Sequence, residues 1–382
     1  MASKCQMAYE KLKMNSFIPL ARPNLLENDI ELVTQVLRSG MLVQGRYVEE
    51  LEKVFIEFTG SSNASALSNG TATLHLSLIA LGIGPGDEVI VPAFSYVATA
   101  NVVELVGAKP IFVDIDSETF NISISAIEKA ISGKTRAIIP VHEFGLACNI
   151  GAIMEIAEKH RLHVIEDAAC ALGAKFKGRH VGSFGSFGSF SLHPRKAISS
   201  GEGGVLITSD SALDKQVKIL RNHGIETVDG QMEFSAFGFN YRMTDFQAAL
   251  VVSQSNRLES SIAYKRELAS VYFEELNQTR LRLPVTPGYT EHTWQTFHVM
   301  LDVGINRNQL ILDLKDKGIG ANYGAQCIPY MKVYRQKYGL NCETFFPHAL
   351  AAYKHGLALP LHDLVTKEHV KYISSTIKKL IS

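Results

Sequence analysis

Strand and helix patterns alternate regularly through the middle of the chain, and this alternation constrains the fold more than any other feature. Short apolar runs predict strands at 88–92, 109–115, 136–142, 162–168, 187–192 and 204–209. The first four are separated by segments with helical spacing, at 97–106, 123–132 and 150–160. Such an alternation predicts an α/β fold with a doubly wound, mostly parallel sheet covered by helices on both faces. Ligands of such sheets bind beyond the carboxyl ends of the strands.

The pattern changes after about residue 245. Long helices are expected over 245–278, followed by a strand within 294–301 and helices at 307–317 and 366–380. A chain of 382 residues is long enough for two domains. We therefore predict a large domain over 1–255, which includes the N-terminal segment, and a smaller C-terminal α+β domain over 256–382.

Charge and cysteine content exclude several classes of protein. Basic and acidic residues number 38 each, so nothing favours a nucleic acid or an anionic membrane as partner. The five cysteines form no Cys-x-x-Cys pair, which argues against a disulfide framework or a structural zinc site. Residues 1–15 lack the apolar core of a signal peptide, and no apolar stretch is long enough to span a membrane. We expect a cytoplasmic protein without a metal site.

Three polar segments follow predicted strands or open a predicted helix, and together they indicate a cofactor. Asp167 ends the strand at 162–168, Lys196 follows the strand at 187–192, and Ser68–Thr73 opens a helix. Pyridoxal phosphate (PLP) needs a lysine for a Schiff base and a carboxylate against its ring nitrogen. Its phosphate suits a helix N-terminus, where the N–H groups of Gly70 and Thr71 are expected. Each signal alone is weak, because a lone aspartate is usually a turn residue and a lone lysine is usually solvated.

The chain resembles the sugar-nucleotide aminotransferases of the DegT/StrS type, which are PLP-dependent and have the aspartate aminotransferase-like fold type I. The resemblance extends from ARPNLLENDI to LALPLHDL, nearly the whole chain. The matching segments are SNGTATLHLSLIALGIGPGDEVIVPAFSYVATAN, FVDID, PVHEFG, VIEDAACALGA, FSLHPRKAISSGEGG, LRNHG and FNYRMTDFQAAL.

This resemblance implies roles for the residues already singled out. Lys196 matches the Schiff-base lysine, and Asp167 matches the carboxylate that pairs with the pyridine nitrogen. Ser191 matches a phosphate-binding hydroxyl. Gly70 and Thr71 match the turn that cradles the phosphate. These five residues are the predicted catalytic and cofactor-binding centre.

Three further cofactor contacts follow from the resemblance. Tyr96 matches an aromatic residue that stacks on the cofactor ring. Cys170 stands where relatives often carry Gln, His or Glu near the ring hydroxyl, and it either alters the cofactor's electronics or simply packs. Asn240 matches an asparagine that reaches the phosphate of the neighbouring subunit, which implies a homodimer with shared active sites.

Substrate contacts are less sharply defined. His142 either contacts the cofactor or the sugar, or is a histidine hydrogen-bonded at a strand end. Arg242 follows Asn240 on the same loop and is expected to face the site. Tyr323 is either a substrate contact or a core aromatic.

The resemblance also implies a reaction. L-Glutamate is the expected amino donor and a keto-sugar nucleotide the acceptor, with C4 of an NDP-4-keto-6-deoxyhexose as the expected position. The product, an NDP-amino sugar, would serve surface polysaccharide or related glycan synthesis. The alternative is other PLP chemistry on a related substrate, such as 3-keto sugar amination or amino-cyclitol synthesis. Lys196 argues against the C3 dehydratases of the family, which carry His at that position.

The run GSFGSFGSF at 182–190 has the composition of a linker but lies between the predicted Asp167 strand and Lys196. We therefore interpret its first half as a turn and its second half as the start of a buried strand. Side chains three apart in a strand point to opposite faces. Phe187 and Phe190 are accordingly expected on opposite faces of the sheet.

Overall fold

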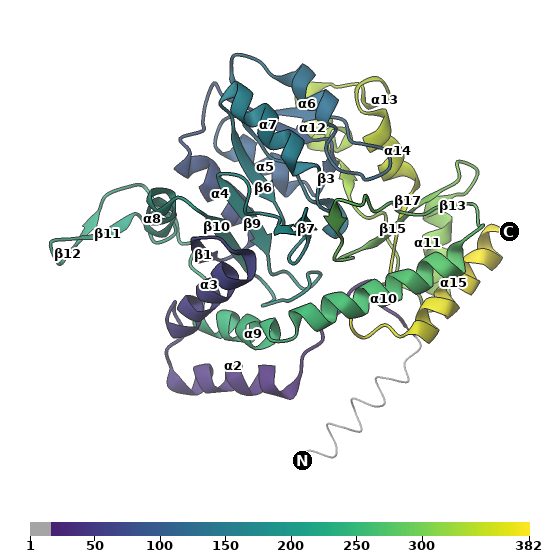
Figure 1. The fold of residues 1–382 in the computed structure, drawn as a ribbon, viewed down its shortest axis with the longest axis horizontal. Helices are drawn as coiled ribbons and strands as arrows, with labels where there is room; N and C mark the ends of the chain where they lie inside the picture. Colours follow the sequence, from purple (N-terminus) through teal and green to yellow (C-terminus); the bar gives the residue numbers. More distant parts are fainter. Residues whose placement is uncertain (1–16) are drawn as a thin grey trace.

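A seven-stranded sheet forms the centre of the computed structural model, which describes residues 17–382 (Figure 1). Residues 1–16 lie outside the described part, and with them Cys5 and the segment expected to lack a signal peptide. The strands are, in spatial order, β1 (Asn63–Leu67), β10 (Gly204–Thr208), β9 (Phe187–Ser191), β6 (His163–Asp167), β5 (Thr135–Ile138), β2 (Glu88–Pro92) and β4 (Lys109–Val113). All six strands expected from the apolar runs are present.

One strand departs from the parallel pattern. β9, β6, β5, β2 and β4 are parallel, whereas β10 pairs antiparallel with both β9 and β1. β1 was not predicted, because its sequence NASAL has small side chains and little apolar character. The sheet is thus mostly parallel, as expected, with one reversed strand near its edge.

Helices cover both faces of the sheet, as the doubly wound fold requires. One core cluster joins the sheet to α4 (Gly70–Ala80), α5 (Ala98–Leu105) and α8 (Ser211–Leu220). The other joins it to α3 (Arg46–Thr59), α6 (Ile124–Ala130), α7 (Ile150–His160) and α9 (Asp245–Ser255). The architecture confirms the predicted fold class.

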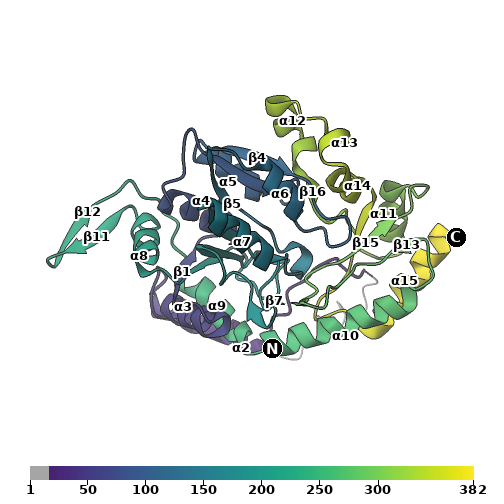
Figure 2. The same cartoon turned by 45° about the horizontal axis from the view of Figure 1, so that its top comes forward.

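The C-terminal part has its own core. A third cluster joins α10 (Leu258–Leu276), α11 (Arg307–Asp316) and α15 (Lys367–Ile381) to a three-stranded sheet of β13 (Leu281–Arg282), β15 (Phe297–Leu301) and β17 (Gly356–Leu359) (Figure 2). Ile18 belongs to this cluster and forms a β-bridge with Ile319. The first residues that the structure describes therefore pack against the C-terminal part. The boundary at 255/256 falls between α9 and α10 and stays a prediction.

Short elements complete the fold. They are α2 (Glu27–Ser39), β3 (Phe94–Ser95), β7 (Lys175–Phe176), β8 (Arg179–His180), β14 (Thr290–Glu291), β16 (Gln326–Cys327), α12 (Lys332–Tyr338), α13 (Cys342–Phe345) and α14 (Pro347–His355). No helix within residues 17–382 is long and apolar enough to cross a membrane.

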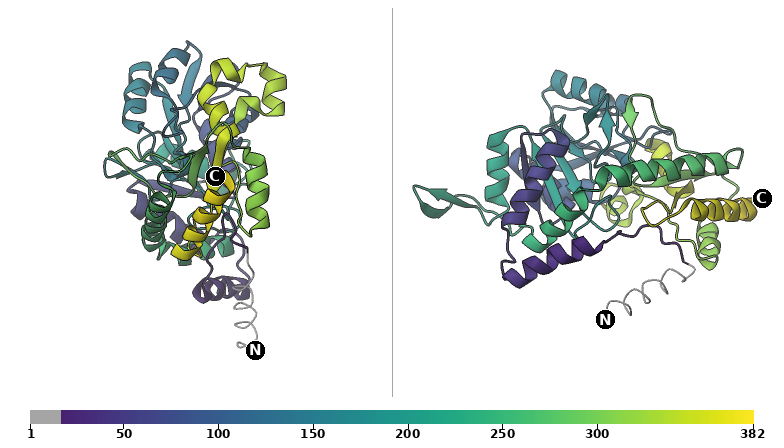
Figure 3. Two further views of the ribbon diagram at one scale, coloured as in Figure 1. Left: turned by 90° about the vertical axis from the view of Figure 1, so that its right-hand side faces the viewer. Right: turned by 60° about the horizontal axis from the view of Figure 1, so that its bottom comes forward.

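A two-stranded hairpin, β11 (Ile225–Val228) with β12 (Gln231–Phe234), projects from the body of the molecule (Figures 1 and 3). Its side chains Met232 and Phe234 are exposed, as is Phe237 directly after it. A hairpin with so few core contacts in its own chain gives no periodic burial signal, and the sequence did not predict it.

The run at 182–190 is part of the body of the protein. Phe187 and Phe190 are both buried and belong to the two different core clusters on opposite sheet faces, which confirms the expectation for β9. The turn before β9 is held by Glu166, whose carboxylate accepts hydrogen bonds from the backbone N–H groups of Gly182, Phe184 and Gly185 at 2.7, 2.7 and 2.9 Å. The linker interpretation is therefore excluded.

Candidate active site

A cavity of about 900 Å³ opens at the carboxyl ends of the central strands. Eight predicted site residues line it: Gly70, Thr71, Tyr96, Asp167, Cys170, Ser191, Lys196 and Tyr323. They come from the start of α4, the segments after β3, β6 and β9, and the segment between α11 and β16. The fold thus brings together residues that lie up to 253 positions apart, from Gly70 to Tyr323.

The start of α4 forms a tight cradle against the end of β9. Asn69 caps the helix, and its side-chain oxygen accepts a hydrogen bond from the Ala72 N–H at 2.8 Å. A Cβ placed on Gly70 would lie 2.9 Å from the Ser191 Cβ, so only glycine allows this approach. The N–H groups of the first helical turn have no acceptor within the helix. Asn69 already accepts from the Ala72 and Thr73 N–H groups, so those of Gly70 and Thr71, two residues that line the cavity beside Ser191, form the site for an anion such as phosphate.

Asp167 is 5% exposed and sits at the end of β6. Its carboxylate accepts hydrogen bonds from the Thr99 hydroxyl at 2.8 Å and the Ala169 N–H at 3.2 Å. Burial raises the pKa of Asp167 above its ordinary value, although these bonds and Lys196 oppose the shift. Sequence reasoning missed Thr99, whose only signal is a hydroxyl within the mostly apolar helix α5.

Lys196 and Cys170 are in direct contact. The Lys196 Nζ donates a hydrogen bond to the Cys170 Sγ at 2.9 Å. Burial disfavours the ammonium, but Cys170, Asp167 and Glu143 outweigh it and raise the pKa of Lys196. Burial also raises the pKa of the Cys170 thiol, although Lys196 opposes the shift. Cys170 therefore makes a polar contact with Lys196, and its effect on the cofactor's electronics stays a prediction.

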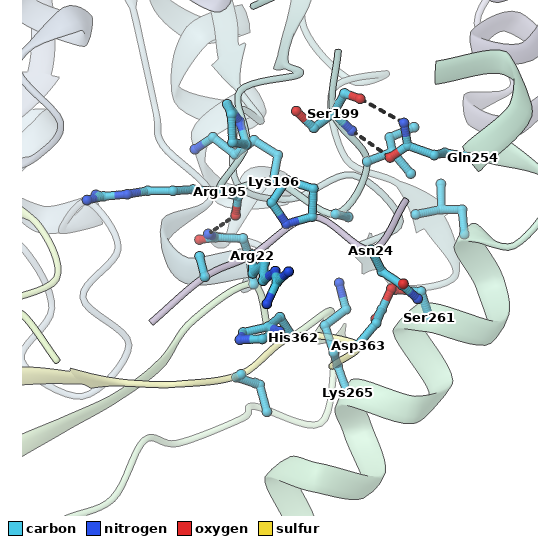
Figure 4. Close-up of a pocket in the computed structure, with 18 of the residues that line it drawn as sticks. Arg22, Asn24, Arg195, Lys196, Ser199, Gln254, Ser261, Lys265, His362 and Asp363 are labelled. Carbon is cyan, nitrogen blue, oxygen red and sulfur yellow. Dashed lines mark hydrogen bonds between the residues drawn. The ribbon is translucent and has the colours of Figure 1, made fainter. Parts of the chain in front are cut away.

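The loop that carries Lys196 is fastened to the rest of the protein by amide side chains (Figure 4). Gln254 from α9 accepts from the Ser199 N–H at 3.1 Å and donates to the Ser199 carbonyl at 2.7 Å. Gln295 donates to the Arg195 carbonyl at 2.9 Å. These paired contacts to the backbone fix where the lysine enters the cavity.

Glu143 also lines the cavity and was not among the predicted site residues. It is 4% exposed, and its Oε2 has no hydrogen-bond partner. Burial and the nearby Asp167 raise the pKa of Glu143 to about 8. The sequence signal that could have identified Glu143 was its position directly after the strand segment at 136–142. The neighbouring residue, His142, was predicted as the site residue instead.

The expectation that His142 contacts the cofactor or the sugar is not met. His142 is fully buried and lies outside the cavity lining. Its Nε2 lies 3.0 Å from Glu166 Oε2, and its Nδ1 accepts from the Cys148 N–H at 3.1 Å. Since both ring nitrogens are engaged in the protein interior, His142 is not a substrate contact in this structure. It is the histidine hydrogen-bonded at a strand end.

Asn240 and Arg242 lie outside this chain's cavity lining. Asn240 is exposed, and Arg242 donates to the side-chain oxygen of Asn222 at 2.5 Å. Both follow the projecting hairpin. Their expected roles require a second subunit and stay predictions.

Tyr323, in contrast, is half-buried at the cavity wall, with the Arg307 guanidinium 5.6 Å from its ring centroid. Tyr96 lies at the wall with 66% of its side chain exposed, so its ring is available for stacking.

The residues present fit PLP. A glycine cradle that a Cβ would fill faces a hydroxyl, a buried carboxylate ends the central strand, and a lysine lines the same cavity. Glu143, one carboxyl oxygen of which is buried and lacks a partner, is among the residues that line the same cavity. No cluster of three or more metal-ligating side chains occurs among residues 17–382.

Comparison with known proteins agrees with this geometry. Solved structures with similar folds include a putative sugar aminotransferase from Streptococcus pneumoniae (30% identity, 95% of this chain and 97% of that chain, TM-score 0.91). Helicobacter pylori PseC, an aminotransferase involved in pseudoaminic acid biosynthesis, is 26% identical over 96% of this chain and 99% of its own, with a TM-score of 0.90.

A sequence relative, the uncharacterized protein MJ1066 of Methanocaldococcus jannaschii, is 36% identical over 96% of this chain and 98% of its own length. The model of the DegT/DnrJ/EryC1/StrS aminotransferase family matches residues 23–378. The chain therefore belongs to the DegT/DnrJ/EryC1/StrS aminotransferase family, whose members depend on PLP.

Proposed function

We propose that this protein moves an amino group from L-glutamate to a keto-sugar nucleotide, at C4 of an NDP-4-keto-6-deoxyhexose. One observation carries the proposal: the residues that fit PLP line a cavity of about 900 Å³. That volume is at the upper end of the range for ligand pockets, so it suits a cofactor together with a second large ligand. The NDP-amino sugar formed would enter surface polysaccharide or related glycan synthesis.

Each side chain has a part in this reaction that follows from its position. PLP supplies an electron sink for amino-group transfer when it is bound. The buried Asp167 provides a negative charge for the ring nitrogen, and Thr99 orients that carboxylate. Lys196 is the residue that would hold the cofactor, and its Nζ would hold and move a proton during the transfer. Tyr323 forms part of the wall of the remaining space, where the sugar nucleotide is expected.

The relatives support the sugar substrate. The Streptococcus pneumoniae protein is described as a putative sugar aminotransferase and is known in PLP and pyridoxamine phosphate forms. Those are the two cofactor states that a two-step amino transfer requires. Helicobacter pylori PseC is an aminotransferase involved in the biosynthesis of pseudoaminic acid.

A homodimer is part of the proposal. Asn240 is exposed and follows a projecting hairpin with exposed Met232 and Phe234. Exposed apolar side chains on a projecting element are typical of protein–protein contacts. A second copy that covers this hairpin would allow Asn240 and Arg242 to reach the partner's cavity.

The half-reaction with L-glutamate tests the proposal. Glutamate should convert the absorbance band of bound PLP at about 410–420 nm to one at about 330 nm. The enzyme that carries the aminated cofactor should then react with a 4-keto sugar nucleotide. Mass spectrometry and NMR of the sugar product should locate the new amine at C4. Amination of 3-keto substrates alone would favour the alternative, and no spectral response to any amino acid would contradict an aminotransferase.

Lys196→Ala provides the matched control for the site. It should remove the band at about 410–420 nm, because no amine remains to bind the aldehyde. Full activity of this variant would overturn the assignment of Lys196.

A further inference from the structure

The backbone around Glu143 is held by neighbouring segments, although one oxygen of its carboxyl group lacks a partner. Its backbone N–H donates to the Asn121 side chain at 2.9 Å. The next residue, Phe144, has a positive φ of 56°, and Gly145 follows with a φ of 93°. A positive φ at a bulky residue is unfavourable and persists only where the surroundings impose it.

The turn after Glu143 is clamped from the other side. The Thr293 N–H donates to the Gly145 carbonyl at 3.1 Å, and a Cβ on Gly145 would lie 2.4 Å from the Thr293 Oγ1. The backbone around Glu143 thus has little freedom to move the carboxyl group elsewhere.

A buried carboxyl oxygen without a hydrogen bond is destabilising by about 1–3 kcal/mol. Glu143 Oε2 is such an atom, and it belongs to a residue that lines the cavity. A bound ligand that supplies a partner would remove this penalty. The orphaned oxygen therefore points to a ligand group at this place.

The order of strands determines which ligand group this is. The cradle at α4 and Ser191 lies on the β1, β10 and β9 side of β6, whereas Glu143 follows β5 on the other side. Asp167, at the end of β6, lies between them. In PLP the phosphate arm and the ring hydroxyl flank the reactive carbon on opposite sides of the ring. With the phosphate in the cradle and the ring nitrogen at Asp167, the hydroxyl edge faces β5.

We propose that Glu143 donates a hydrogen bond to the ring hydroxyl oxygen of bound PLP and thereby positions the ring and sets its protonation. The groups that face Glu143 are Asp167 from β6, Lys196 and Cys170 from the neighbouring loops, and Ser95 from β3. Cys170 is a weak donor and already contacts Lys196, so it does not fill this role. The inference concerns the cofactor and does not depend on the identity of the sugar.

The raised pKa of Glu143, about 8, fits a donor. A neutral carboxyl carries a proton that it can share with an anionic ring oxygen, whereas a carboxylate would repel that oxygen. A donor stabilises the negative charge on the ring oxygen and so makes the proton beside it easier to lose. Removing the donor should therefore raise the pH at which the visible band of bound PLP titrates.

The test compares Glu143→Leu and Glu143→Gln in the reconstituted holoenzyme, with the exposed Glu158→Leu as the matched control. Glu143→Leu should raise the pH midpoint of the absorbance transition by about one unit and weaken PLP affinity by about tenfold. Glu143→Gln keeps a neutral donor and should stay within about threefold in affinity and a few tenths of a pH unit. Glu158→Leu should match the wild type.

Unfolding of the cofactor-free protein separates positioning from a purely structural role. Because Glu143→Leu removes a buried carboxyl with an unpaired oxygen, its melting temperature should equal or exceed that of the wild type. If it fails to fold, the unbranched Glu143→Met takes its place with the same expectations.

An unchanged or lowered pH midpoint in the apolar variants would overturn the proposal, as would a Gln variant that behaves like Leu. Wild-type protein that binds PLP but does not react with glutamate would contradict the proposed function and leave this inference intact.

Discussion

Glu166→Gln tests whether the interior of the large sheet depends on one buried carboxylate. Glu166 is fully buried and accepts four hydrogen bonds: one oxygen takes those from Phe184 and Gly185, and the other takes those from Gly182 and His142. The Cys148 N–H donates to His142 Nδ1, so the His142 proton lies on Nε2 and is donated to Glu166.

Glutamine cannot reproduce this arrangement. If its NH₂ group occupies one carboxylate position, it meets the Gly182 and His142 donors; in the other, it meets the Phe184 and Gly185 donors. In either orientation two buried N–H groups lose their acceptor. Each unsatisfied donor destabilises the fold by about 1–3 kcal/mol, so we expect a total of about 3–4 kcal/mol. For a chain of 382 residues this corresponds to a drop in melting temperature of about 4–5 °C.

The measurement is thermal unfolding of the cofactor-free protein, with Glu158→Gln on the exposed side of α7 as control. The control should stay within about 0.5 kcal/mol of the wild type. A change of less than about 1 °C in Glu166→Gln would refute the reasoning.

The pH dependence gives a second check on Glu166. Burial raises its pKa, but the hydrogen bonds from His142, Gly182 and Gly185 outweigh burial and hold the pKa below the ordinary 4.5. Because the folded-state pKa is lowered, the carboxylate's contribution to stability is complete above about pH 4.5 and is lost as the pH falls further. The difference between wild type and Glu166→Gln should therefore shrink below that pH. A difference that stays constant into acid would contradict the assignment.

Three other substitutions test the site and the core. Gly70→Ala places a Cβ 2.9 Å from the Ser191 Cβ, so PLP affinity measured by titration should fall at least about tenfold; unchanged affinity would remove the cradle from the cofactor site. Thr99→Val removes the 2.8 Å hydrogen bond to Asp167 and should weaken PLP binding by roughly tenfold; because it leaves a buried carboxyl oxygen without its donor, it should also lower the unfolding free energy of the cofactor-free protein by about 1–3 kcal/mol. Phe187→Ala empties a fully buried position and should lower the unfolding free energy by about 3–5 kcal/mol in urea; a loss below about 1 kcal/mol would show that β9 is not packed as described.

The sequence predicted the parts of the fold that bury a periodic apolar face. Strands such as 88–92 and helices such as 150–160 occupy those residues in the structure. β1 was missed because alanine and serine carry little apolar signal, although Ala64 and Ala66 are fully buried. The hairpin at 225–234 was missed because its apolar side chains face outward. Periodicity of large apolar side chains reports burial within the chain, so it misses elements that bury small side chains, such as β1, or that expose apolar ones, such as the hairpin.

The site residues also divide into those that the sequence predicted and those that it could not predict. Lys196, Asp167 and the Gly70 turn were found because each combines a distinctive residue with a strand end or a helix start. Between His142 and Glu143 the sequence offered no way to choose, since both follow the same strand. In the structure Glu143 lines the cavity and His142 does not. The residue after Glu143, Phe144, has a positive φ, which no local pattern predicts at a phenylalanine.

The turn held by Glu166 has a consequence for which mutations the GSFGSFGSF run tolerates. Glu166 binds backbone N–H groups, so it is indifferent to the side chains at those positions. The glycines are different: a Cβ on Gly185 would lie 2.3 Å from the Val164 carbonyl oxygen, and one on Gly188 would lie 2.1 Å from that of Gly182. In a library of variants of this run that is selected for folded protein, the glycine positions should therefore keep glycine. Ser186 should accept many replacements. Ser183 should accept few, because it is buried and its hydroxyl accepts a hydrogen bond from Arg179 and donates one to the His180 carbonyl. The triplet repeat would then disappear while the turn remained.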